Sequence, residues 1–393
     1  MHEVIGYSFP NDVHIHWSLM IVMYPYLTGL VAGAFIVSAL YHLFGREEFR
    51  PIGRFSLLTS LAFLFFAPLP LLNHLGQPLR AMNIMITPHL TSAMAGFGFL
   101  LAIYSIIVVL EVWLIFRRDI VEIARGSRGL KRQFYKALAL WVYDVSAEAQ
   151  EIDHKAVLAL TALGIPAACL LHGYVGFLFG ALKANPWWST PLMPIIFLFS
   201  AVMSGIALLI ILYQVVCLFN GWAVNRETIR GLARWLWLFL ILTVTLELLE
   251  IITLAYEKSE EWEVIATLLT TKLSVSFISI QMVLGALIPF ILLMITVLLD
   301  TYLHDRVRNT LALIASLLLM LQVFAMRWNV VIGGQIFSKS LRGFRDYSVG
   351  LFEKEGILAA VALMVGPFVL LAILNRLLPS LTREAEPAAG PTP

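Results

Sequence analysis

Residues 190–219 read TPLMPIIFLFSAVMSGIALLIILYQVVCLF, without one charged side chain. A membrane-spanning helix needs about 20 apolar residues, because the hydrocarbon core of a bilayer is about 30 Å thick. Eight further apolar stretches are long enough, at 17–44, 55–75, 90–116, 156–183, 232–256, 274–300, 310–330 and 356–378. The sequence therefore predicts an all-α integral membrane protein with about nine transmembrane helices.

The overall composition agrees with a chain that lies mostly in lipid. It is 60% hydrophobic and 13% charged, whereas soluble domains carry about 25% charged residues. The net charge of +2 and the lack of a strongly basic patch give no indication of nucleic-acid binding. The two cysteines, Cys169 and Cys217, are too few for a disulfide framework or a four-thiolate metal site. Any iron–sulfur cluster must therefore sit on a partner.

Basic residues in the connecting segments predict the orientation. Alternate connections hold 18 and 9 of the Lys and Arg residues, and the positive-inside rule places the richer set in the cytoplasm. The N-terminus is thus predicted outside and the C-terminus inside. The N-terminal segment, residues 1–16, contains no Lys or Arg and does not resemble a cleavable signal peptide.

This orientation divides the protein into segments. We expect a periplasmic N-terminal segment (1–16), a polytopic membrane domain (17–380) and a disordered cytoplasmic tail (381–393). Within the membrane domain, 117–155 is predicted to be a cytoplasmic loop with a basic amphipathic helix. The loop 327–355 is basic and aromatic on the predicted outer side, where we expect it to contact a partner subunit.

Ionisable residues at membrane depth are functional hypotheses, because their desolvation is costly. His172 lies inside the predicted fourth helix. Glu247 and Glu250 are three residues apart in the sixth, so they lie on one face. Two carboxylates in apolar surroundings repel, so at least one should hold a proton. The alternatives are a histidine and a carboxylate pair that only form structural hydrogen bonds.

Further polar residues lie near the predicted outer boundary. His74, Gln77 and Arg80 follow the second helix, in Asn73-His74-Leu75-Gly76-Gln77-Pro78-Leu79-Arg80. Tyr24 and Tyr26 are in the first helix, where tyrosines often serve only as interfacial anchors. Glu111 in the third helix lies near the inner boundary, where an ion pair with Arg117 or Arg118 is the simplest expectation.

A quinone site is compatible with this set. No Walker motif, dinucleotide fingerprint or hydrolase elbow is present in the sequence. A quinone needs a slot for its apolar tail, one or two groups that bond the ring carbonyls, and an acid or imidazole that exchanges protons. His172 with Tyr24, and Glu250 behind them, would suffice.

Several motifs in order resemble those of the polysulfide reductase membrane subunits. They are Pro10-Asn11 with His16-Trp17, Gly29 to Gly33, His74 to Arg80, Thr91-Ser92-Ala93-Met94, His172-Gly173 with Gly176, Asn185-Pro186-Trp187-Trp188, and Arg327 to Gln335. The pattern is similar to the longer branch of that family, which includes membrane subunits of periplasmic hydrogenases, sulfite-reduction-linked complexes and alternative complex III. The resemblance covers residues 10 to about 380.

The resemblance implies two four-helix bundles plus an extra helix, with a quinone pocket near the outer face. It also implies a periplasmic ferredoxin-type iron–sulfur partner and no haem in this protein. The family's quinone-contacting residue in the fourth helix matches His172, and its polar residue in the first helix falls nearest Tyr24. His74 stands where the family has an acid, and Gln77 where it has an arginine, which makes a proton route through that motif doubtful.

Together these observations predict a quinone- or quinol-reactive membrane subunit of a respiratory oxidoreductase in a bacterial or archaeal cytoplasmic membrane. The substrate is expected to be menaquinone or ubiquinone, the partners are the iron–sulfur subunit and a further catalytic redox subunit, and proton translocation is a further expectation. The predicted binding residues are His172, Tyr24, Tyr26, Gln77 and Arg80, the predicted proton-handling residues are Glu250, Glu247 and His74, and no metal site is predicted.

Other functions remain open on the sequence alone. His42, His74, His89 or His172 could ligate the iron of a b-type haem. The glutamate pair could serve a proton-coupled secondary transporter, although no clear internal repeat is seen. A passive membrane anchor without a quinone site is the third alternative.

Overall fold

The computed structural model describes residues 14–89, 91–258, 260–337, 341 and 343–381. Most of the predicted N-terminal segment and nearly all of the predicted tail lie outside these residues. Within them, nine helical segments are long and apolar enough to cross a membrane, which confirms the predicted all-α, multi-pass membrane protein.

The spans are built from α-helices with two π-helical sections. They are α1 (Leu19–His42), α2 and α3 (Arg50–Phe66 and Leu69–His74), α5 (Ala93–Gly126), α7 (Ala147–Gly180), α8 (Met193–Asn220), α9 (Arg226–Glu257), η3 and α11 (Ser274–Leu287 and Ile288–Leu298), α12, η4 and α13 (Asp305–Trp328, Asn329–Gly333 and Gly334–Ile336) and α14 (Ile357–Leu377). The shorter elements are η1 (Glu47–Phe49), η2 (Pro78–Arg80), α4 (Asn83–Ile86), α6 (Gly129–Leu138) and α10 (Glu260–Thr270).

The spanning helices form two groups of four. One group contains α1, α2, α5 and α7, and the other contains α8, α9, η3–α11 and α12. Contacts of α8 with α1 and α7 join the two groups, and α14 packs on α2 as the extra helix. Because α1 is apolar on all sides, it is buried almost throughout its length.

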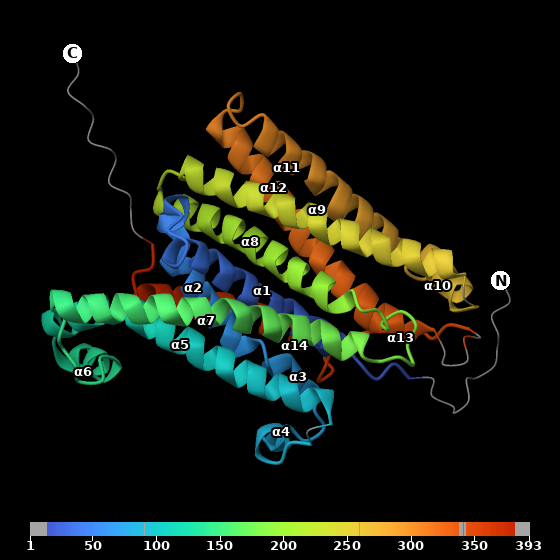
Figure 1. The fold of residues 1–393 in the computed structure, drawn as a ribbon, viewed down its shortest axis with the longest axis horizontal. Helices are drawn as coiled ribbons and strands as arrows, with labels where there is room; N and C mark the ends of the chain where they lie inside the picture. The colour runs from blue at the N-terminus through green and yellow to red at the C-terminus, as the bar shows by residue number, and fades with distance from the viewer. Residues whose placement is uncertain (1–13, 90, 259, 338–340, 342, 382–393) are drawn as a thin grey trace.

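Successive spans alternate in direction, so the connections gather at two ends (Figure 1). The N-terminal end of the bundle, where α1 begins, also holds η2, α4, α10 and α13. The opposite end holds α6, between α5 and α7 (Figure 1). The predicted outer side corresponds to the N-terminal end.

Small residues set the closest helix contacts. A Cβ placed on Gly33 would lie 2.4 Å from the carbonyl oxygen of Ala201, and one on Gly205 would lie 2.4 Å from the backbone of Gly33. The α1 and α8 backbones therefore touch, and no side chain fits between them. A Cβ on Gly176 would lie 2.7 Å from the carbonyl oxygen of Met193, so α7 meets α8 in the same way.

Two segment boundaries differ from the prediction. The eighth span does not end near residue 330 but continues through η4 and α13 to Ile336. Arg327 is therefore inside a span and not in the predicted loop 327–355, because neighbouring helices supply polar partners for its guanidinium group.

At the opposite end, the predicted loop 117–155 is largely helical. α5 continues to Gly126 and α7 already begins at Ala147, so the basic segment forms the end of α5 and the short α6 instead of one amphipathic helix. Arg117 holds the two long helices together by donating to Asp153.

Candidate functional site

The first cluster of buried polar side chains surrounds Arg327 of α12. Its side chain is fully buried, and its Nη2 atom lies 2.7 Å from the hydroxyl of Ser200 and 3.2 Å from Nε2 of His172. The guanidinium carbon lies 3.7 Å from the ring centre of Phe197, whose carbonyl oxygen also accepts a hydrogen bond from Nη2. α7, α8 and α12 therefore meet at one buried cation.

This contact determines the tautomer of His172. A guanidinium group can only donate hydrogen bonds, so Nε2 of His172 must accept, and the ring proton is assigned to Nδ1. His172 is itself fully buried, and Nδ1 has no hydrogen-bond partner among the described residues. The ring therefore carries an N–H donor that no acceptor among the described residues satisfies.

A second cluster links α9, η3, α12 and η4. Glu247 accepts hydrogen bonds from the amides of Gln281 at 2.9 Å and Gln322 at 3.3 Å. Asn329 donates to Gln281 at 2.7 Å and accepts from Ser276 at 2.6 Å. Each member is thus held by at least one neighbour, and the amides supply the donors that the buried carboxylate needs.

Glu250 lies one turn beyond Glu247 and is less constrained. Its Oε1 atom is buried without a hydrogen-bond partner among the described residues. Both glutamates line a narrow cavity, together with Gln281 and Asn329. Its volume of about 20 Å³ is enough for about one water molecule.

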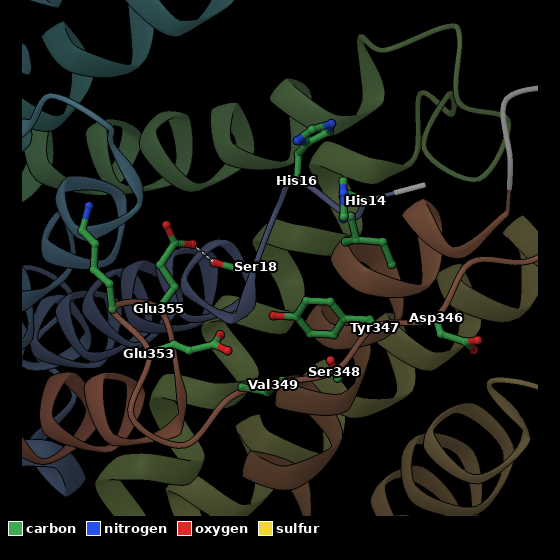
Figure 2. Close-up of a pocket in the computed structure, with 11 residues that line it drawn as sticks. His14, His16, Ser18, Asp346, Tyr347, Ser348, Val349, Glu353 and Glu355 are labelled. Carbon is green, nitrogen blue, oxygen red and sulfur yellow. Dashed lines mark hydrogen bonds between the residues drawn. The ribbon is translucent and has the colours of Figure 1, made fainter. Parts of the chain in front are cut away.

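A third polar group lies at the N-terminal end of the bundle. His74 Nδ1 is 2.8 Å from the carboxylate of Glu355, and Ser18 donates to the same carboxylate. Burial alone would raise the pKa of Glu355, but the hydrogen bonds from Ser18 and His74 outweigh burial and hold this pKa below its usual range. Glu355 and Ser18 line a cavity of about 430 Å³, into which Tyr347 also points (Figure 2).

The predicted quinone-binding residues differ in burial and in whether their polar atoms already have partners. Tyr24 is buried edge-on against Phe97, and its hydroxyl has no hydrogen-bond partner among the described residues. The Tyr26 hydroxyl donates to the carbonyl oxygen of Met320 and is already engaged. Gln77 and Arg80 are exposed at the end of the bundle, whereas His172 is enclosed within it. The structure therefore does not bring all the predicted binding residues together.

Sequence reasoning misses Arg327 and Glu355 as site residues. It places Arg327 in a loop. The sequence feature that could have identified this residue as part of a span is its position directly after an apolar run. Glu355 carries no local signal, because its partner His74 is 281 residues away.

The expected ion pair of Glu111 is wrong. Glu111 accepts a hydrogen bond from Thr161 at 2.7 Å, while Arg117 binds Asp153 and Arg118 binds Glu122. The reason is the spacing, since residues six and seven positions apart on a helix do not lie within the reach of an i, i+4 pair.

No group of three or more His, Cys, Asp or Glu side chains in the described ranges could hold a metal ion. The polar clusters are built instead from single ionisable groups surrounded by amides and hydroxyls.

Comparison with curated proteins finds relatives among membrane subunits of reductases. The C subunit of selenate reductase from Mesobacillus selenatarsenatis is 27% identical, over 94% of this protein and 87% of its own length. Protein NrfD of Escherichia coli is 28% identical over 54% of this protein and 63% of its own length. The C polypeptide of polysulfide reductase from Wolinella succinogenes is 28% identical over 50% of this protein and 57% of its own length.

The matches to these last two relatives span less than two thirds of their lengths, whereas the match to the selenate reductase subunit is nearly end to end. A family model described as polysulphide reductase, NrfD, matches residues 9–339, which include α1 to α13 and both buried polar clusters. The chain belongs to the polysulphide reductase NrfD family.

Proposed function

We propose that this protein is the quinone- or quinol-reactive membrane subunit of a respiratory oxidoreductase. Its redox substrate is menaquinone or ubiquinone, and its electrons are exchanged with a periplasmic iron–sulfur subunit. The family supports a role as a membrane subunit of a reductase complex. By analogy with the names of its relatives, a further catalytic subunit of the complex would act on the terminal substrate.

The observation that carries this proposal is a set of three buried polar atoms without hydrogen-bond partners among the described residues. They are the hydroxyl of Tyr24, Nδ1 of His172 and Oε1 of Glu250, and each belongs to a residue that the sequence singles out for quinone chemistry. Buried polar groups in proteins are nearly always paired, and each exception needs an explanation. A quinone whose ring oxygens accept hydrogen bonds would satisfy the two donors, Tyr24 and His172, while Glu250 would exchange protons.

These residues suit the chemistry of a quinone. The ring carbonyls accept hydrogen bonds, which His172 Nδ1–H and the Tyr24 hydroxyl can donate. Oxidation of a quinol releases two electrons and two protons. In this proposal Glu250 and Glu247 exchange the protons, and the iron–sulfur clusters of the partner exchange the electrons.

The contacts of His74 and His172 weigh against these two residues as haem ligands. Nδ1 of His74 is bonded to Glu355 and Nε2 of His172 faces Arg327, so one nitrogen of each ring is already engaged. A guanidinium group beside His172 would also have to move before Nε2 could bind iron.

The test is His172→Ala in the intact complex, with His89→Ala as the matched control, because His89 is exposed and bonds only locally to Thr91. We expect H172A to lower quinone-linked turnover by about tenfold or more, the effect of losing one hydrogen bond of about 1.5 kcal/mol. The amounts of assembled complex should be equal in both variants. Unchanged turnover in H172A would contradict the proposed role.

A further inference from the structure

An apolar groove runs along the membrane-facing surface between α9 and η3–α11, which lie side by side (Figure 1). It has a volume of about 280 Å³, and its lining includes Val244 and Leu248 of α9 and Met282 and Ala286 of η3. The groove faces lipid, since 45% of the Leu248 side chain is exposed.

The groove lies beside the narrow cavity that Glu250 lines, and α9 and η3 contribute to both. On α9, Val244 and Leu248 line the groove, while Glu247 and Ile251, three residues further along, line the cavity. On η3, the neighbours Gln281 and Met282 line the cavity and the groove respectively. Because consecutive residues point to different sides of a helix, the cavity and the groove lie on adjacent sides of the same pair of helices.

The cavity offers one hydrogen-bond donor and one acceptor without partners. The indole Nε1 of Trp187 and Oε1 of Glu250 both belong to residues that line it, and neither atom has a hydrogen-bond partner among the described residues. Trp187 is only 9% exposed. An indole N–H can only donate, so it requires a ligand acceptor.

We propose that the groove and the cavity together form a binding site for a prenylated quinone, separate from His172 and Tyr24. The prenyl tail lies along Val244, Leu248 and Ala286. A ring oxygen accepts a hydrogen bond from Trp187, and Glu250 bonds a second ring oxygen. This site rests on the proposed function for the identity of the ring and adds a lateral route from the bilayer to the glutamate pair.

The lining favours a neutral head group over a phospholipid. None of the described residues that line the cavity or the groove is Lys or Arg, so no cation there would pair with a phosphate. A quinone ring carries only carbonyl or hydroxyl oxygens, which match one donor and one carboxyl group.

The ring needs more space than the cavity of about 20 Å³ provides. Met193 and Met326 line it, and methionine side chains adapt readily because they are unbranched and have three rotatable bonds. The opposite wall is η3, a π-helix of 14 residues. π-Helical segments are rare and frequently occur at functional sites, which is consistent with ligand binding at this wall of the cavity.

The experiment is photolabelling of the intact complex in native membranes with an azido-substituted prenylated benzoquinone, followed by peptide mapping. Leu248→Trp fills the groove, and Leu249→Trp is its matched control, because Leu249 is equally lipid-exposed at 47% but does not line the groove. We expect label in peptides of 244–251 and 277–286. It should be lost in L248W and kept in L249W.

The head-group contact is tested with Trp187→Phe, which keeps a ring but removes the N–H. Trp237→Phe is the control, since the indole nitrogen of Trp237 also lacks a partner among the described residues but does not line the cavity. Half-maximal labelling in W187F should require about fivefold to tenfold more probe, the loss expected for one hydrogen bond. W237F should label like the unaltered protein.

The outcomes separate this inference from the proposed function. Label confined to peptides containing Tyr24 or His172 would overturn the second site and leave the proposed function intact. Equal labelling of L248W and L249W, or competition by phosphatidylglycerol and not by unlabelled quinone, would also overturn it. Absence of label anywhere in the protein would refute both.

Discussion

Replacing Arg327 by methionine tests whether this buried cation positions His172. Methionine is close to arginine in length but has no donor, so Arg327→Met removes the hydrogen bonds to His172, Ser200 and the Phe197 carbonyl. We expect quinone-linked turnover to fall because nothing then holds His172 in the tautomer with the proton on Nδ1.

The magnitude follows from the contact that is lost. A hydrogen bond from a charged donor contributes about 1.5–3 kcal/mol. Since each 1.4 kcal/mol corresponds to a factor of ten, quinone-linked turnover should fall by about tenfold to a hundredfold. Stability should fall as well. Arg327 interacts electrostatically with the buried Glu247, and that carboxylate keeps no nearby cation when Arg327 is removed. The acceptors on His172, Ser200 and Phe197 also lose their donor, so the loss is expected to be about 1–3 kcal/mol or more.

The assay is quinol-dependent turnover of the purified complex, with KM and kcat measured separately, beside thermal unfolding in the same detergent. Ser200→Ala is the control, because it removes another partner of Arg327 and leaves the contact with His172. In a protein that already carries H172A, R327M should lower turnover little further, because the effects of substituting coupled residues are not additive. An equal further loss in that background would refute the positioning role.

Three further predictions concern pH, packing and orientation. The pKa of Glu355 is lowered, so its contribution to stability is complete above about pH 4.3, the ordinary pKa of a glutamate, and is lost as the pH falls through the lowered pKa. Thermal unfolding measured from pH 3 to 6 should show this loss of stability in acid. His74→Ala should make the loss smaller. Gly205→Leu should destabilise the protein by about 1–3 kcal/mol or more in thermal unfolding, since its side chain would collide with α1. A cysteine at Leu79, which is 98% exposed, should react with an impermeant maleimide from the periplasmic side, and one at Leu130, 84% exposed, only from the cytoplasmic side.

Each of these has a control within the protein. Gly173→Ala should be nearly silent, because the nearest neighbour of its added Cβ is 3.9 Å away; an equal effect at Gly173 and Gly205 would argue against the close approach of α1 and α8. An unchanged acid profile in H74A would contradict the role of His74 at Glu355. Reversed maleimide accessibility would overturn the predicted orientation.

Much of the fold could be predicted because lipid leaves few alternatives. A stretch such as 190–219, without a charge, can bury its backbone polar groups in a bilayer only as a helix. The apolar stretches alone thus predict the nine spans and the membrane class. The depth of His172, Glu247 and Glu250 follows from their place in those stretches.

Contacts between spans could not be predicted in the same way. Helix periodicity is local and relates residues three or four positions apart, whereas Ser18 meets Glu355 across 337 residues and Arg327 meets His172 across 155. The partner of each helix depends on the packing of the whole bundle, including the contact of α1 with α8 at Gly33.

The order of amino acids is thus enough to show that this protein spans the membrane and that His172, Glu247 and Glu250 lie within it. The packed bundle adds Arg327 to that set and gives Glu111 its partner Thr161. It also reveals buried polar atoms that lack partners among the described residues, including those of Tyr24, His172, Trp187 and Glu250. These features cannot be predicted from local sequence patterns. Within the membrane, the hydrogen-bond partners of a buried side chain come from neighbouring helices, and the packing of the bundle decides which helices are neighbours.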